Sequence, residues 1–183
     1  LDKTLILNSD DGNESKELII KNYPGEKTVL SSGIVLDLKW EKYKNGIMRA
    51  VVKGSPVMDM LFVNGELKSM ARYPNYDEKA VRYNGTSALA TAPERVKKWK
   101  CPEGGYLHAM HKHDWGDFHY RITGKNEKGE LQLEGGWQNN RPMGIHNENR
   151  MVENIFEELD APRECYYDKK EGWLYYYPLP DEK

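Results

Sequence analysis

The stretch WEKYKNGIMRAVV, residues 40–52, places Asn45 and Gly46 between two arms that read as β-strands. Asn-Gly is favoured in tight hairpin turns because both residues adopt a positive φ there at little cost. Repeated short hairpins with little helix indicate an antiparallel sandwich or barrel. We therefore expect an all-β, sandwich-like fold. Further turns of this kind are expected at Asn64-Gly65, more weakly at Asn84-Gly85, and over residues 126–129 and 169–172.

Two stretches read as short helices. APERVKKW, residues 92–99, has Pro93 near a helix start, where the missing N–H is tolerated. VENIFEELD, residues 152–160, repeats apolar residues at helical spacing and is followed by Ala161-Pro162, which would end a helix. We expect one or two short helices. The apolar face of the second would hold Val152, Ile155, Phe156 and Leu159.

The first 36 residues carry three short apolar runs, at residues 5–7, 18–20 and 29–30, separated by turn-rich segments. Pro24-Gly25 fits the centre of a type II turn. Short strands at this spacing, with no helix between them, indicate either a meander or one coil of a parallel β-solenoid.

Composition limits the partners of this chain. It has 183 residues and a formal net charge of −2, with Lys and Arg scattered and no basic stripe, so we expect no nucleic-acid partner. No apolar run approaches the roughly 20 residues that cross a bilayer, so we expect no membrane partner. Cys101 and Cys165 either form one disulfide or stay free. The lack of a CxxC pair argues against structural zinc.

Most of the chain resembles a known group of proteins. The resemblance lies in LFVNGELKSMARYPN (residues 61–75), HYRITGKNEKGELQLEGGWQNNR (119–141) and VENIFEELDAPRECYYDKKEGWLYYYP (152–178), with YPGEKTVLSSG (23–33) resembling an early coil. These stretches resemble the N-terminal part of right-handed parallel β-helix carbohydrate-active proteins, which include glycoside hydrolases of the β-xylosidase and α-fucosidase type. In that group a β-sandwich interrupts the β-helix after an early coil.

The resemblance implies a domain division and a role. Residues 1–36 would be a β-helix coil fragment and residues 37–183 a β-sandwich-like accessory domain, with 151–183 returning toward the β-helix. The catalytic carboxylates of that group lie on later coils, so this chain alone is expected to be non-catalytic and without cofactor. Its implied partners are a polysaccharide or oligosaccharide and the rest of the β-helix, outside the cell or in the periplasm. One departure is APREC, residues 161–165, where the group usually has Ala-Pro-Gly-Glu-Trp; Arg163 and Cys165 replace a turn glycine and a packing tryptophan.

Four of the five histidines lie between His108 and His119. Residues two apart on a strand face the same side, so His111 and His113 are near enough to share a metal. A third ligand would complete a catalytic zinc site, but no HExxH motif accompanies them. We expect no metal, and a metal-dependent enzyme built on the 108–119 cluster remains an alternative. The candidates for the third ligand are His108, His119, Asp114 and Asp117.

The alternative use of these histidines is sugar contact. A tryptophan offers a flat apolar face to a sugar ring, while histidine and arginine offer hydrogen-bond donors. A free-standing carbohydrate-binding module is therefore a second alternative, and a protein-binding scaffold a third. The expected substrate-binding residues are His111, His113, Trp115, His119, Arg121, Trp137, Asn139 and Arg141. The carboxylates Glu153, Glu157, Glu158 and Asp160 read as a solvated face, without a catalytic role.

Overall fold

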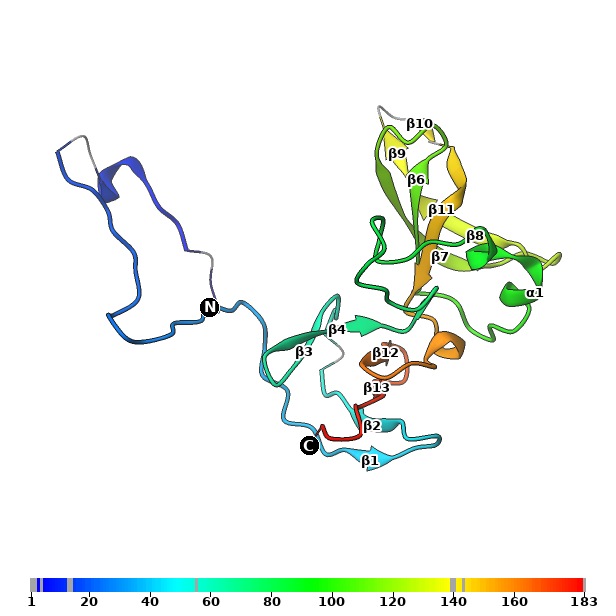
Figure 1. The fold of residues 1–183 in the computed structure, drawn as a ribbon, viewed down its shortest axis with the longest axis horizontal. Coiled ribbons are helices and arrows are strands. Elements are labelled where there is room, and N and C mark those ends of the chain that lie inside the picture. The colour runs from blue at the N-terminus through cyan, green and yellow to red at the C-terminus, as the bar shows by residue number, and fades with distance from the viewer. Residues whose placement is uncertain are drawn as a thin grey trace. The chain divides into compact units, whose positions relative to one another are not determined.

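The computed structural model describes residues 3, 5–12, 15–54, 56–138, 141–142 and 144–182 (Figure 1). It divides into two compact units, Leu1–Asp37 and Leu38–Lys183. We call the first the N-terminal segment and the second the β domain. No helix in the described ranges is long and apolar enough to cross a membrane.

The N-terminal segment has little regular structure. It contains a 3-10 turn, η1 (Ser9–Asp11). The predicted type II turn is confirmed, because Gly25 has φ +85° and the Glu26 N–H donates to the Tyr23 carbonyl at 3.0 Å. The three apolar runs form no strand in the described residues, contrary to expectation. A strand needs a neighbour to take its backbone hydrogen bonds, and these runs have none within the segment.

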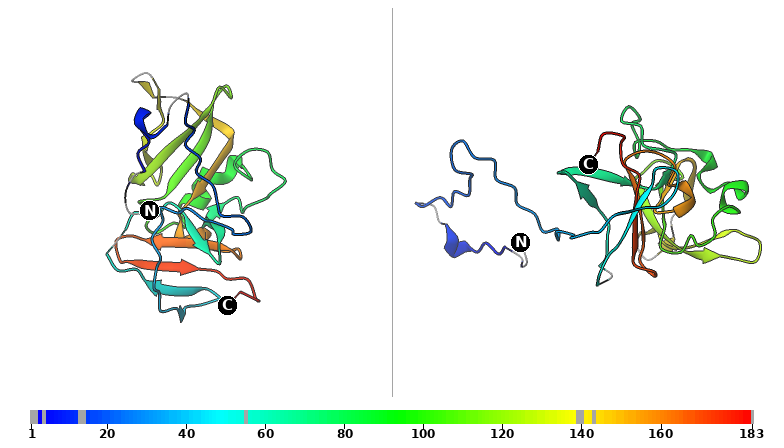
Figure 2. Two further views of the ribbon diagram at one scale, coloured as in Figure 1. Left: turned by 90° about the vertical axis from the view of Figure 1, so that its left-hand side faces the viewer. Right: turned by 90° about the horizontal axis from the view of Figure 1, so that it is seen from below.

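The β domain holds two main sheets, which occupy opposite ends of it in Figures 1 and 2. Strand pairing is antiparallel throughout except between β12 and β4, and a small hairpin adds β9 (Trp137–Gln138) and β10 (Arg141–Pro142). The prediction of an all-β, sandwich-like domain is confirmed. The first sheet has the order β1 (Glu41–Lys42), β2 (Met48–Val51), β13 (Trp173–Tyr176), β12 (Glu164–Asp168), β4 (Glu66–Met70), β3 (Leu61–Val63). The second has the order β5 (Arg72–Tyr73), β11 (Ile145–Glu153), β6 (Tyr106–His111), β7 (Asp117–Lys125), β8 (Leu131–Gly135).

The β-hairpins lie at the turn residues that predicted them, with one exception. Val63 pairs with Glu66, so Asn64 (φ 54°) and Gly65 (φ +80°) form a two-residue turn with both φ positive. The turns at Asn45-Gly46, 126–129 and 169–172 also join paired strands, as predicted.

The predicted hairpin at Asn84-Gly85 is wrong. Asn84 (φ 50°) and Gly85 (φ +125°) do form a turn, but no strands flank it. The buried guanidinium of Arg72 donates to the carbonyl oxygens of Tyr83 at 2.6 Å and Gly85 at 3.0 Å. A side chain therefore satisfies carbonyls that a partner strand would otherwise take.

One of the two predicted helices exists. Residues 93–96 form α1 (Pro93–Val96), after the 3-10 turn η2 (Ala88–Thr91). The helix predicted over 152–160 is wrong, because β11 extends to Glu153 and only a 3-10 turn follows, η3 (Phe156–Glu158). β11 pairs with β5 on one side and β6 on the other. Two ladders of backbone hydrogen bonds outweigh the local helical spacing.

The hydrophobic core has a main cluster under the second sheet, around η2 and α1. Trp99 is fully buried there, and its Nε1 donates to Glu158 Oε1 at 2.7 Å. A second cluster lies where the two sheets meet, and includes Ile47, Ala71 and Leu159. Both cysteines are free thiols; Cys101 is exposed and Cys165 is buried.

The chain passes between the two sheets twice, and the two passages lie side by side. The first runs from β4 through Ala71 to β5, and the second from β11 to β12. The Ala71 N–H donates to the Cys165 carbonyl at 2.6 Å, and the Ile155 N–H donates to the Ala71 carbonyl at 3.3 Å. Ala71 is fully buried there. We call this place the sheet crossing.

Candidate functional site

Three of the predicted sugar-contact residues lie together at the tip of the β6–β7 hairpin. Trp115 is 81% exposed, and its indole stacks on His111 with ring centroids 5.1 Å apart and an angle of 18° between the planes. His113 lies against both rings. Burial lowers the pKa of His111, and the neighbouring His113 and Lys112 lower it further. The tip thus offers a flat apolar indole face backed by a neutral imidazole.

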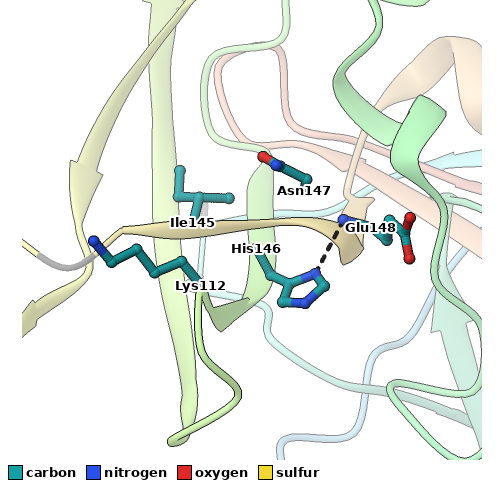
Figure 3. Close-up of a pocket in the computed structure, with 5 residues that line it drawn as sticks. All are labelled: Lys112, Ile145, His146, Asn147 and Glu148. Carbon is teal, nitrogen blue, oxygen red and sulfur yellow. Dashed lines mark hydrogen bonds between the residues drawn. The ribbon is translucent and has the colours of Figure 1, made fainter.

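A pocket of about 450 Å³ lies next to this tip, between Lys112 and the start of β11 (Figure 3). His146 Nδ1 accepts hydrogen bonds from the backbone N–H groups of Glu148 at 3.0 Å and Asn149 at 2.9 Å. These bonds fix the ring and leave its Nε2 side to carry the proton. An ammonium, an imidazole and a carboxylate therefore surround one small hollow. The lining residues are Lys112, Ile145, His146, Asn147 and Glu148.

The other two histidines form a row of titratable groups on the face of the second sheet. His108 and His119 lie opposite one another on β6 and β7, and their Nδ1 atoms are in contact. His108 Nε2 lies 2.8 Å from Glu153 Oε1 on β11. Burial acts to raise the pKa of Glu153, but the hydrogen bond and charge of His108, with Arg72 and His119, bring it below its ordinary value. Glu153 is therefore ionised at neutral pH.

In the part of the chain that the structure describes, no group of three or more His, Cys, Asp or Glu side chains converges on one point. His111 is the last residue of β6, and its Nδ1 accepts the backbone N–H of His113 at 3.2 Å. The strand has ended by His113, but the two rings still lie side by side, with centroids 5.5 Å apart. The metal-dependent enzyme gains no support from this geometry.

The remaining predicted site residues are scattered. Arg121 is exposed on β7, and Trp137 is 62% exposed on β9. Asn139 lies outside the described residues, and Arg141 is described only as part of β10. Binding by all eight residues stays a prediction.

The acidic group at residues 153–160 is not a solvated face, contrary to expectation. Glu158 is only 4% exposed, because it accepts from Trp99 Nε1 and lies 2.6 Å from Arg95 Nη1. Glu157 Oε1 accepts the Lys100 backbone N–H at 3.0 Å. These carboxylates hold the α1 region against η3. The expectation failed because it assumed a helix that does not form.

Sequence reasoning missed a second pocket, of about 600 Å³, at the sheet crossing. We call it the crossing pocket. Glu164, the first residue of β12, lies in its wall and is 2% exposed. Its Oε2 accepts the N–H groups of Asp160 at 3.2 Å and Ala161 at 3.1 Å. Its Oε1 has no partner in hydrogen-bond geometry among the described residues.

Burial raises the pKa of Glu164 to about 8, although the backbone N–H groups of Ala161, Asp160 and Arg72 act in the opposite direction. The crossing pocket therefore has a neutral carboxyl at Glu164, while Glu153, also in its lining, is ionised. The APREC departure was the one sequence signal near this place. Arg163 occupies the left-handed region at φ 74°, a conformation that glycine adopts most easily.

Comparison with known proteins gives one informative match. No family model and no curated protein matches the chain. A solved structure titled "Glycoside hydrolase" is similar, with a TM-score of 0.61 and 26% sequence identity over 87% of this chain. The matching part is 31% of that protein, so the chain spans about a third of its length. The β domain thus has a glycoside hydrolase-related fold.

Proposed function

We propose that this chain is a non-catalytic accessory and structural domain of a larger glycoside hydrolase of the β-helix type, acting on complex polysaccharide outside the cell or in the periplasm. The chain is similar to about a third of a glycoside hydrolase, which supports the proposal that it is one part of such a protein. The observation that carries the proposal is the surface of the N-terminal segment.

The N-terminal segment leaves its apolar side chains in water. Soluble monomers rarely expose large contiguous apolar patches, and such patches mark surfaces that another element covers. The covering element in the proposal is the rest of a β-helix, whose next coil would pair with the runs at residues 18–20 and 29–30. The exposed side chains are Leu5, Ile6, Leu7, Leu18, Ile19, Ile20, Tyr23, Val29, Leu30, Ile34 and Val35, each at least 48% accessible.

Hydrogen exchange tests this role. We expect the amides of residues 15–37 to exchange at least about tenfold more slowly in the full-length gene product than in the 183-residue chain, because pairing protects backbone N–H groups. The amides of β6 and β11 serve as the internal reference and should exchange alike in both proteins. Equally fast exchange of residues 15–37 in both would contradict the proposal.

The absence of catalysis is tested with the 183-residue chain alone. We expect no release of nitrophenol from a panel of p-nitrophenyl glycosides above the buffer rate. Enzyme-like turnover that is lost on Glu153→Gln and kept on Glu157→Gln would overturn the non-catalytic role.

A free-standing carbohydrate-binding module is the second candidate, and the 81% exposed indole of Trp115 favours it. It predicts saturable binding to a glycan array that is lost on Trp115→Ala. Trp40→Ala is the matched control, since Trp40 is also exposed but packs near Tyr176 in the first sheet.

A further inference from the structure

The crossing pocket combines room for a small ligand with a buried carboxyl group that the fold uses only in part. Its volume of about 600 Å³ lies in the range of small-molecule sites. The Oε2 atom of Glu164 accepts two backbone N–H groups, and the Arg72 backbone N–H also acts on the carboxyl, while Oε1 is buried and has no partner in hydrogen-bond geometry in the described part of the chain. Buried polar atoms are normally paired. This oxygen therefore points to a partner that comes from outside the chain.

The cationic groups in the lining already have hydrogen-bond partners, which disfavours an anionic ligand. The Lys68 ammonium lies 2.7 Å from Glu182, and the Arg163 guanidinium lies 2.8 Å from Glu66. The Arg72 guanidinium donates to four nearby backbone carbonyl oxygens. A phosphate or uronate would have to replace one of these bonds.

Counted without their partners outside the pocket, the charged residues of the lining balance. Asp59 and Glu78 are exposed carboxylates in it, and Glu153 is a third. With Glu164 neutral, these three balance the three cations of the lining. Because Glu182 and Glu66 also lie beside two of these cations, the pocket does not attract an anionic ligand.

Apolar surface lies next to these polar groups. Tyr76 is 54% exposed, Met60 is 65% exposed and Leu67 is 54% exposed, and all three line the pocket. An exposed tyrosine ring beside paired donors and acceptors suits a molecule with one apolar face and several hydroxyls. A pyranose ring has this character, because its axial C–H groups lie on one face and its hydroxyls point outward.

We propose that the crossing pocket binds an uncharged sugar residue, with Tyr76 against its C–H face and Glu153 and Glu164 hydrogen-bonded to its hydroxyls. Glu164 donates from Oε1 as a neutral carboxyl, and Glu153 accepts as a carboxylate. The site is separate from the Trp115 tip. It rests on the proposed function in taking a glycan as the ligand.

The test is a titration of the ¹⁵N-labelled 183-residue chain with D-xylose, L-fucose, D-galactose and xylobiose at pH 6.5, followed by amide shifts. D-glucuronate and D-glucosamine serve as charged probes. We expect saturable shifts of the amides of Arg72, Tyr76 and Glu164 with at least one neutral sugar. Tyr76→Ala should weaken binding about tenfold or more. Tyr23→Ala should leave binding unchanged, because Tyr23 is an exposed tyrosine of the N-terminal segment, outside the pocket lining.

Three results would overturn the proposal. The first is a complete absence of saturable shifts at the crossing pocket with any neutral sugar. The second is binding that Trp115→Ala abolishes and Tyr76→Ala does not, which places the sugar at the hairpin tip. The third is stronger binding of glucuronate or glucosamine, which contradicts the ligand class. None of these results bears on the hydrogen exchange of residues 15–37, so the accessory role stands or falls separately.

Discussion

The N-terminal segment and the β domain contain similar apolar runs with opposite fates. Ile19, in the run Leu18-Ile19-Ile20, is 65% exposed, whereas Leu174, in the run Trp173–Tyr176, is fully buried. The difference lies in the neighbours, because β13 pairs with β2 on one side and β12 on the other. An apolar run is therefore a strand only where other strands take its hydrogen bonds and cover its side chains.

The largest effect expected in this comparison is a pH dependence that belongs to the β domain. The Glu164 carboxyl has its pKa raised to about 8 in the folded state. It therefore keeps a proton that the unfolded chain releases near pH 4.5. Its stabilising contribution is complete below pH 4.5 and is lost as the pH rises through 8. At about 1.4 kcal/mol for each unit of the pKa difference, the free energy of unfolding falls by roughly 5 kcal/mol over this range. We expect Glu164→Gln to remove this decline between pH 5 and pH 9.

Urea unfolding at pH 5 and pH 9 measures the decline. Glu17→Gln is the matched control, because Glu17 is an exposed carboxylate of the N-terminal segment, and the variant should show the wild-type decline. An equal decline in Glu164→Gln and wild type would show that another group causes it.

The next effect compares two isoleucines. Ile122 on β7 is fully buried in the main core, while Ile19 is 65% exposed. We expect Ile122→Ala to lower the free energy of unfolding by about 3 kcal/mol, through lost burial and the cavity it leaves. Ile19→Ala should change it by less than about 0.5 kcal/mol. Chemical denaturation followed by tryptophan fluorescence measures both, and a similar loss in the two variants would break the comparison.

The smallest effect concerns left-handed positions, which the two regions fill differently. The N-terminal segment has Gly25 at φ +85°, whereas the β domain has Arg163 at φ 74°. A residue with a Cβ destabilises the fold there by about 1 kcal/mol. The exposed ion pair of Arg163 with Glu66 stabilises it by less than that. We expect Arg163→Gly to raise the thermal midpoint by a few degrees.

Arg82→Gly is the control for this change. Arg82 also has an exposed ion pair, with Asp114 at 3.0 Å, but it is not among the residues with positive φ. The control should lower the midpoint slightly, because glycine adds freedom to the unfolded chain. Equal shifts in the two variants would show that backbone strain at Arg163 is absent.

Local signals were reliable where a single turn decides the conformation. Asn64-Gly65 fixed the β3–β4 hairpin because only residues that tolerate positive φ can make a two-residue turn with the right twist. The helix predicted from the apolar spacing of residues 152–160 does not form, because the strand partners of Val152 come from residues 72–73 and 106–107, far along the chain.

The candidate site was predicted in part. Trp115 and His113 were grouped correctly, since they are close in sequence on one hairpin tip. The crossing pocket was not predicted, because Arg72, Glu153 and Glu164 come from three separate strands. Likewise, burial of Glu158 depends on Trp99, 59 residues away.

The sequence by itself determined the class of the fold and the position of its hairpins, because turn residues act on their own backbone within a few residues. Only the tertiary structure decided which apolar runs are buried and which carboxyl groups are neutral. Both depend on what lies across the sheet or the crossing, and that is set by pairing between distant strands. Glu164 reads in the sequence as an ordinary surface acid, and the meeting of β4, β5, β11 and β12 makes it a buried, half-paired group.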